Sequence, residues 1–222
     1  MATNRMASIM NFRLPLFSLL TLLSASSAFA AETDKDMIRK AAQWAAPVMG
    51  SACDFATAID GNEAERSAVY YIPWRYAGQG QDEPDNQYTL VRLYCFSGAY
   101  NEVFVYVGRE SAESDFKLLS FSEPKLAYDY TDENFNALKA PPKVVGYLAR
   151  TEQINSDYDP ATKTIFSGAK WRGIGDAWSS GSWEFIEGEF VLKKYEVDPT
   201  YDANADKPVA GQPESYTVYP EK

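Results

Sequence analysis

The chain has 222 residues, of which 31 are acidic and 21 basic, giving a net charge of −10, and it contains no histidine. Such acidity repels nucleic acid and anionic lipid headgroups and favours basic partners or cations, although it also keeps a protein soluble whatever its partners. Without histidine there can be no Ser-His-Asp triad, no Cys-His pair and no His-ligated zinc, which excludes the commonest hydrolase and metalloenzyme designs.

Residues 1–30 have the order of a secretory signal peptide. Arg5 and Arg13 are their only charges, an apolar run follows, and Ala28-x-Ala30 fits the pattern that predicts cleavage after Ala30. The apolar run is about half the length that a bilayer-spanning helix needs, so we expect no membrane anchor after cleavage. The sequence therefore predicts export. The removed segment carries two arginines and no acid, so the mature chain has a net charge of −12.

The only two cysteines are Cys53 and Cys95. In an exported protein an even number of cysteines predicts a disulfide. The bridge would close a loop of about 43 residues and contribute roughly 4 kcal/mol to stability. A reactive thiol is the less favoured alternative, because no histidine is present to activate it.

Residues 33–46 predict a helix. Thr33 suits the N-cap with Asp36 three residues later, an apolar stripe follows, and Pro47 is expected to end the helix. Residues 51–61 are a candidate second short helix, so we expect one or two N-terminal helices.

The chain beyond residue 66 is rich in Val, Tyr, Phe, Trp and Thr, in runs separated by Gly, Pro, Asn and Asp clusters, which is typical of β-strands. We expect strands at residues 67–74, 87–96, 102–109, 115–122, 143–151, 162–171, 182–186 and 189–197. The expected fold class is therefore mainly β (α+β), with antiparallel sheets and hairpins.

Two hairpins can be placed in register. A two-residue turn at Glu187-Gly188 would pair Phe185 with Phe190 and Trp183 with Leu192, so that one face is core and the other is solvated. In the earlier hairpin, alternation places residues 91, 93 and 95 on one face, which turns Cys95 inward toward a helix bearing Cys53.

Residues 31–197 are expected to form a single exported domain. The sequences of the two hairpins are weakly similar. The alternative to a single domain is therefore a duplication, with β units at about 67–130 and 143–197. The long polar loop 77–86 is expected to be exposed. Residues 198–222 hold four prolines and no clear periodicity, and predict an extended tail that Tyr216, Val218 and Tyr219 could pin.

The loop at residues 171–178 is the candidate ligand-binding site, through Trp171, Arg172, Asp176 and Trp178. Aromatic faces could hold a sugar ring and the charged groups its hydroxyls. The competing interpretation is structural: the glycines let the chain turn, Arg172 pairs with Asp176, and the tryptophans fill the core.

Asp202, Asn204 and Asp206 alternate like the first ligands of a calcium loop. Lys207 replaces the required glycine and Pro213 stands where the bidentate glutamate belongs, so the pattern is not an EF-hand and offers only a weak, irregular site. We therefore predict no metal and no cofactor.

Two stretches of the sequence are similar to an exported proteobacterial family known as domain of unknown function 1176. The family carries a Cys-x-x-Gly-Ala-Tyr-Asn turn, matched from Cys95 to Asn101. It also carries an Arg-Gly-x-Gly-Asp-Cys loop followed by Trp and a Gly-Phe-x-Leu hairpin, matched by Arg172, Gly173, Gly175, Asp176, Trp183, Gly188, Phe190 and Leu192. Ala177 stands where that loop has Cys, and no later Cys could partner it, which suggests the loss of a second disulfide. The resemblance implies a periplasmic protein and brings no catalytic residues.

These observations contain no catalytic constellation. The expected function is that of a non-enzymatic periplasmic binding or inhibitor-type protein, whose acidic, aromatic-rich β surface takes a basic protein such as lysozyme. One alternative is a carboxylate-based hydrolase or a glycan-binding module that uses residues 171–178 on an envelope glycan. Another is a purely structural envelope factor.

Overall fold

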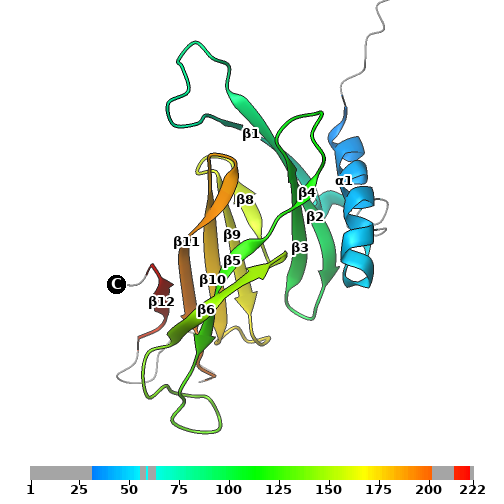
Figure 1. The fold of residues 1–222 in the computed structure, drawn as a ribbon. Coiled ribbons are helices and arrows are strands. Elements are labelled where there is room, and N and C mark those ends of the chain that lie inside the picture. The colour runs from blue at the N-terminus through cyan, green and yellow to red at the C-terminus, as the bar shows by residue number, and fades with distance from the viewer. Residues whose placement is uncertain (1–31, 56–58, 60–63, 202–212, 221–222) are drawn as a thin grey trace, which may run out of the picture. The chain divides into compact units, whose positions relative to one another are not determined.

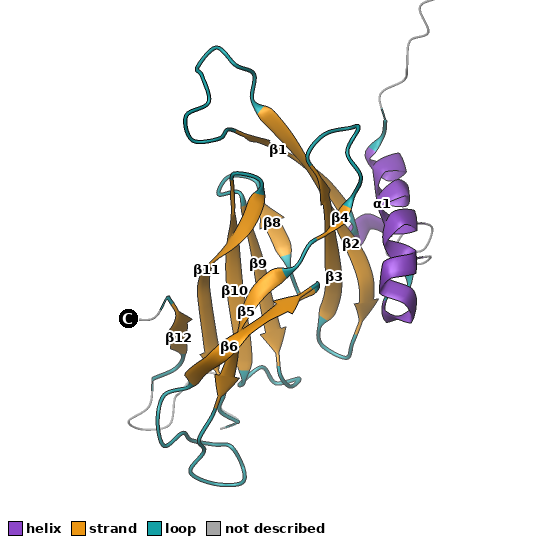
Figure 2. Ribbon diagram, in the orientation of Figure 1, coloured by secondary structure: helices purple, strands orange, loops and turns teal. Residues whose placement is uncertain are grey.

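The computed structural model describes residues 32–55, 59, 64–201 and 213–220. The predicted signal peptide and the calcium candidates Asp202, Asn204 and Asp206 lie outside the described residues. The described chain begins with an α-helix and continues as β-strands numbered β1 to β12 (Figures 1 and 2).

Helix α1 (Asp34–Met49) begins as predicted at Thr33, whose side-chain oxygen accepts a hydrogen bond from the Asp36 N–H at 3.2 Å. The prediction that Pro47 ends the helix is wrong, because α1 continues for two more residues. A proline in the last turn removes a single hydrogen bond. The helix ends at Gly50, whose φ of 56° suits glycine and whose N–H donates to the Ala46 carbonyl.

The residues after α1 form the 3-10 turn η1 (Gly50–Ala52), and Ala64–Arg66 form a second, η2. The candidate second helix at 51–61 includes residues 56–58 and 60–61, which lie outside the described ranges. The predicted disulfide is confirmed: Cys53 is bonded to Cys95 and links the segment after α1 to the strand that carries Cys95.

The first sheet is antiparallel and has the order β1-β2-β3-β4, with β7 also paired to β3. Its strands are β1 (Ala68–Trp74), β2 (Asn86–Ser97), β3 (Glu102–Arg109), β4 (Lys117–Leu118) and β7 (Glu152–Ile154).

The second sheet is also antiparallel and has the order β12-β11-β10-β9-β8. Its strands are β8 (Asp157–Asp159), β9 (Thr164–Lys170), β10 (Trp178–Ile186), β11 (Glu189–Asp198) and β12 (Tyr216–Tyr219). A separate two-stranded ribbon pairs β5 (Phe121–Ala127) with β6 (Lys143–Arg150). The predicted fold class, mainly β with antiparallel sheets, is confirmed.

The first sheet lies between α1 and the second sheet (Figure 1). Strand β2 is consequently buried on both faces. Val91 and Leu93 share the face of Cys95, which is bonded to Cys53 just beyond α1. The opposite face carries Tyr88, whose ring centroid lies 5.0 Å from that of Phe185 in the second sheet. The two sheets and α1 therefore share one hydrophobic core.

The hairpin β10–β11 has the predicted register, with Trp183 opposite Leu192 and Phe185 opposite Phe190. Its turn residues both have positive φ, 48° at Glu187 and 97° at Gly188, as tight two-residue hairpin turns require. The face predicted to belong to the core does so, because Trp183, Phe185 and Leu192 are buried.

The predicted single strand at 115–122 is wrong. The chain leaves the first sheet after β4 and begins the β5–β6 ribbon at Phe121, so the run is divided between two sheets. Strand β7 belongs to the later half of the chain but completes the first sheet, which joins the two proposed β units. In the tail, β12 pairs with β11, and Val218 is buried there.

Candidate binding surface

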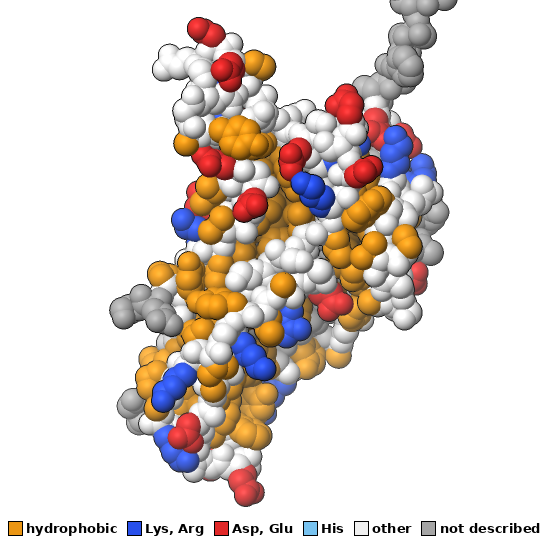
Figure 3. Space-filling view, in the orientation of Figure 1, with side chains coloured by type: hydrophobic (Ala, Val, Ile, Leu, Met, Phe, Trp, Pro, Cys, Tyr) orange, Lys and Arg blue, Asp and Glu red, His pale blue; other side chains and the backbone are white. Residues whose placement is uncertain are grey.

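Acidic side chains gather at one end of the molecule, over the loop between β1 and β2, the loop between β3 and β4, the β10–β11 turn and the start of α1 (Figure 3). This acidic end consists of exposed residues, namely Glu32, Asp34, Asp36, Asp82, Glu83, Asp85, Glu110, Glu113, Asp115, Glu187 and Glu189. Some are neutralised by neighbours; Glu110, for example, pairs with Lys117 at 2.7 Å.

The loop at residues 75–85, between β1 and β2, is held by its own hydrogen bonds. The Arg75 guanidinium pairs with Asp85 at 2.5 Å and also contacts the Gly80 carbonyl. The Gln79 side chain accepts the Tyr76 N–H at 3.1 Å and donates to the Pro84 carbonyl at 2.7 Å. The Arg75 and Gln79 side chains are thus turned toward the loop itself, and their hydrogen bonds order its backbone.

The base of this loop is attached to the second sheet. The Ala77 N–H donates to the Glu187 carboxylate at 2.7 Å, which links the loop to the β10–β11 turn. The Lys163 ammonium donates to the Pro73 carbonyl at 2.6 Å, at the end of β1. Two elements distant in sequence therefore support the loop.

The outer side of the loop presents a small set of exposed groups. Asp82 and Glu83 are exposed carboxylates, and no cation pairs with either among the described residues. The Tyr76 side chain, in the same loop, is 54% exposed and packs edge-on against Trp74, with ring centroids 4.4 Å apart. The loop therefore offers negative charge and one aromatic ring on a rigid support.

In the predicted ligand loop 171–178, Asp176 is buried with 1% exposure. The Arg172 guanidinium donates two hydrogen bonds to the Asp176 carboxylate, one of them at 2.7 Å. The Ala177 N–H donates a third hydrogen bond to this carboxylate at 3.1 Å. Arg172 also lies over the Tyr201 ring, 4.8 Å from its centroid. The carboxylate is therefore inaccessible to a ligand in this conformation, and the role of the loop in ligand binding stays a prediction.

The two tryptophans of that loop are partly buried. The indole N–H of Trp171 donates to Ser179 at 3.3 Å, while Trp178 begins β10. Gly175 has a φ of 74°, as the turn requires, and its N–H donates to the Arg172 carbonyl at 3.0 Å.

The two stretches that carry the family resemblance, around residues 95–101 and 170–178, contact each other. The Tyr100 hydroxyl donates to the Trp171 carbonyl at 3.0 Å. The Asn101 side chain donates to the Lys170 carbonyl at 2.8 Å and accepts the Lys170 N–H at 3.2 Å. The turn between β2 and β3 is thereby attached to the start of loop 171–178. These motif residues connect the two sheets.

Within the described ranges, no cluster of three or more acidic or cysteine side chains could hold a metal ion. No helix in the described part of the chain is long and apolar enough to cross a membrane.

This architecture defines a class: an antiparallel two-sheet protein with one helix and one disulfide, whose sheets are joined by the contacts of its sequence motifs. The family described as a protein of unknown function (DUF1176) matches residues 72–210, and the chain belongs to this family. No curated protein and no solved structure matches the chain. Ala177 occupies the position at which the Arg-Gly-x-Gly-Asp-Cys loop of the family pattern has Cys, and it is fully buried.

Proposed function

We propose that this protein is a non-enzymatic, inhibitor-type binding protein of the periplasm that docks a basic partner through loop 75–85. The observation that carries the proposal is the set of hydrogen bonds that orders this acidic loop, in which Arg75 and Gln79 bond within the loop while Asp82 and Glu83 are exposed. A loop that is already ordered loses little conformational entropy on binding.

The charge of the loop suits a cationic partner. Exposed carboxylates increase the rate of encounter with a basic protein, and this effect weakens as salt screens the charges. Tyr76 supplies an aromatic side chain of the kind that often anchors interfaces. A basic enzyme with an open cleft, such as lysozyme, fits a protruding acidic loop.

Two features support the periplasm as the compartment. Residues 1–30 have the order of a signal peptide, and a structural disulfide is typical of oxidising compartments. The alternative, a hydrolase or glycan module built on residues 171–178, has weaker support because the Asp176 carboxylate is committed to Arg172.

The experiment is a binding and inhibition assay with purified lysozyme and the oxidised protein, at low salt and at about 0.5 M salt. The double variant Asp82→Asn/Glu83→Gln should lower the low-salt association rate constant about tenfold. The matched control Glu133→Gln/Glu214→Gln removes the same charge from exposed positions outside the acidic end, and should change the rate less than about twofold. An equal loss in the control, or no binding of lysozyme at low salt, would overturn the proposal.

A further inference from the structure

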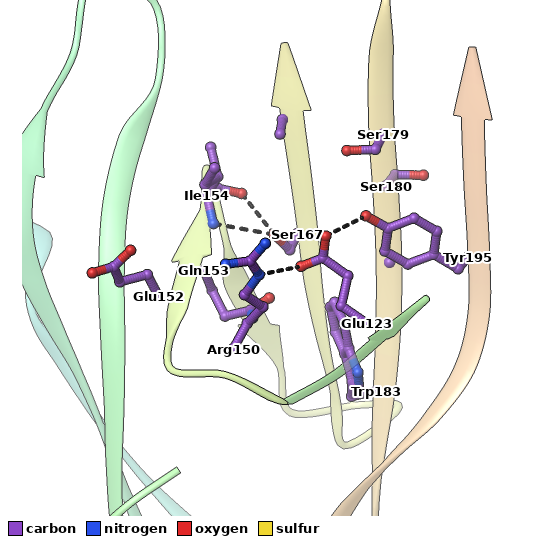
Figure 4. A pocket seen from close by; sticks show the side chains of 12 residues that line it. Glu123, Arg150, Glu152, Gln153, Ile154, Ser167, Ser179, Ser180, Trp183 and Tyr195 are labelled. Atoms are coloured by element: carbon purple, nitrogen blue, oxygen red, sulfur yellow. Dashed lines mark hydrogen bonds and ion pairs between the residues drawn. The ribbon is translucent and has the colours of Figure 1, made fainter. Parts of the chain in front are cut away.

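A chamber of about 190 Å³ lies between the β5–β6 ribbon, β7 and the face of β9, β10 and β11 that turns toward them. Figure 4 shows Glu123 and Arg150 of the ribbon facing Ser167 and Tyr195 of the second sheet. None of these residues belongs to loop 75–85, so the chamber is separate from the surface proposed above.

The chamber exists because this part of the second sheet carries small side chains. Ser167 lies opposite Gly181, and Ala169 lies opposite Ser179, on neighbouring strands. At Gly181 the Trp183 ring takes the place of a side chain, because a Cβ atom there would come within 2.3 Å of that ring, so the open space lies over Ser167, Ala169 and Ser179. Larger residues would normally fill such a layer between packed strands, so the sequence leaves this space open.

One wall of the chamber is an ordered polar group. The Glu123 carboxylate accepts a hydrogen bond from the Tyr195 hydroxyl at 3.1 Å and lies 3.7 Å from Arg150. Burial raises the pKa of Tyr195 well above its ordinary value, so the hydroxyl remains a donor at neutral pH. The wall therefore presents fixed donors and acceptors to the chamber.

Besides the chamber itself, the surroundings of the Gln153 side chain indicate a ligand. Its residue is only 3% exposed, it lines the chamber, and none of the described residues hydrogen-bonds to its side-chain amide. The neighbouring Ser167 is satisfied, because it donates to the Ile154 carbonyl at 2.9 Å. Among the described residues, the fully buried side-chain atoms without a hydrogen-bond partner belong to Trp74, Arg92 and Arg109 and not to Gln153, so the polar atoms of Gln153 are open to the chamber. Its amide can there donate to a ligand and accept from it.

From this geometry we propose that the chamber binds one neutral sugar ring. Its volume is below the about 300–1,000 Å³ of sites for drug-sized ligands, which limits the occupant to a single ring. Arg150 and Glu123 offset each other's charge, and Glu152 is exposed, so solvent screens its charge and no strong net field selects a charged ring. The remaining lining groups are hydroxyls, an amide, the Trp183 ring and the apolar residues Ile154, Ala169 and Gly181, which suit hydroxyl groups and the apolar face of a sugar.

The test uses glucose, glucosamine and glucuronate, which share one ring but differ in charge. Binding is followed by tryptophan fluorescence, because Trp183 lines the chamber, and by NMR shifts of the Gln153 side-chain amide. Glucose should bind and glucuronate should bind at least about tenfold more weakly. A preference for glucosamine or glucuronate would overturn the neutral class.

Three variants locate the site. Gln153→Met keeps the side-chain length and should weaken glucose binding about tenfold by removing the amide. Ala169→Met should abolish binding by filling the chamber, whereas Ala149→Met, at an exposed position of β6, should leave it unchanged. Thermal unfolding of each variant confirms that it is folded.

Two outcomes would overturn the assignment: no shift with any of the three sugars, or glucose binding that survives Ala169→Met. A titration with maltose distinguishes a ring at the end of a glycan from a free monosaccharide. A maltose affinity equal to that of glucose supports the end of a glycan as the ligand, and an affinity about tenfold weaker supports a free monosaccharide. The loop variant Asp82→Asn/Glu83→Gln should leave glucose binding unchanged, so failure of one proposal is distinguishable from failure of the other.

Discussion

Gly108 of β3 lies against the ring of Tyr88 of β2, so closely that a Cβ atom on Gly108 would come within 2.0 Å of the Tyr88 hydroxyl oxygen. Both residues belong to buried strands of the first sheet. Gly108→Ala should therefore lower the free energy of unfolding by about 1–3 kcal/mol, the range typical of overpacked cores. Urea unfolding measures this loss. Gly168→Ala is the control, because a Cβ there meets no atom within 4 Å; equal stability of the two variants would contradict the prediction.

Asp176→Asn tests whether the buried carboxylate of loop 171–178 is structural. Removing one partner of a buried ion pair costs about 3–5 kcal/mol, and because the Arg172 side chain is 37% exposed we expect the lower part of this range. The control Glu184→Gln breaks the exposed pair with Lys193 and should cost at most about 1 kcal/mol. Unfolding by urea compares the two. If Asp176→Asn were as stable as the wild type, its interpretation as a structural group would be wrong.

Reduction of the disulfide should weaken the whole domain. The Cys53–Cys95 bridge joins residues 42 positions apart, and chain-entropy arithmetic assigns such a loop roughly 4 kcal/mol. The variant Cys53→Ala/Cys95→Ala should lose about that amount, and dithiothreitol should lower the melting temperature of the wild type but not of the variant. An unchanged wild-type melting temperature after complete reduction would contradict this.

Stability should fall in alkaline solution. Burial raises the pKa of Tyr88 and of Tyr158 from 10.0 to about 12, because the phenolate would lose its hydration. The unfolded chain releases these protons first, so the stability from the neutral rings is fully present below pH 10.0 and is lost as the pH rises through about 12. Urea unfolding across this range measures the decline. Tyr88→Phe should make the decline shallower, and a pH-independent free energy of unfolding would refute the assignment.

The sequence predicted the elements whose signal is local. The β10–β11 register follows from alternation around Glu187-Gly188, and the disulfide follows from two cysteines in a chain with a predicted export signal. The strands β7 and β8 were missed because each has three residues, too few for a periodicity to be visible. Their positions depend on pairing partners distant in the chain.

The candidate sites depend still more on distant contacts. The exposed polar loop was predicted, but its rigidity arises from the inward side chains of Arg75 and Gln79 and from Glu187, 110 residues away. The chamber was not predicted, because Ser167, Ala169 and Gly181 have no local pattern that marks a space. Only the approach of the β5–β6 ribbon to these small residues creates it.

The pairing of β7 with β3 has a consequence for the order of folding. The Tyr106 hydroxyl donates to Ser156, 50 residues later, so the first sheet cannot be completed until the later half of the chain is present. Non-local pairings of this kind slow folding and leave a sheet edge unprotected in the meantime. The Cys53–Cys95 bridge requires only the first 95 residues. The bridge can therefore form before β7 is available, and it then holds β2 in place while the edge of β3 that pairs with β7 is still open.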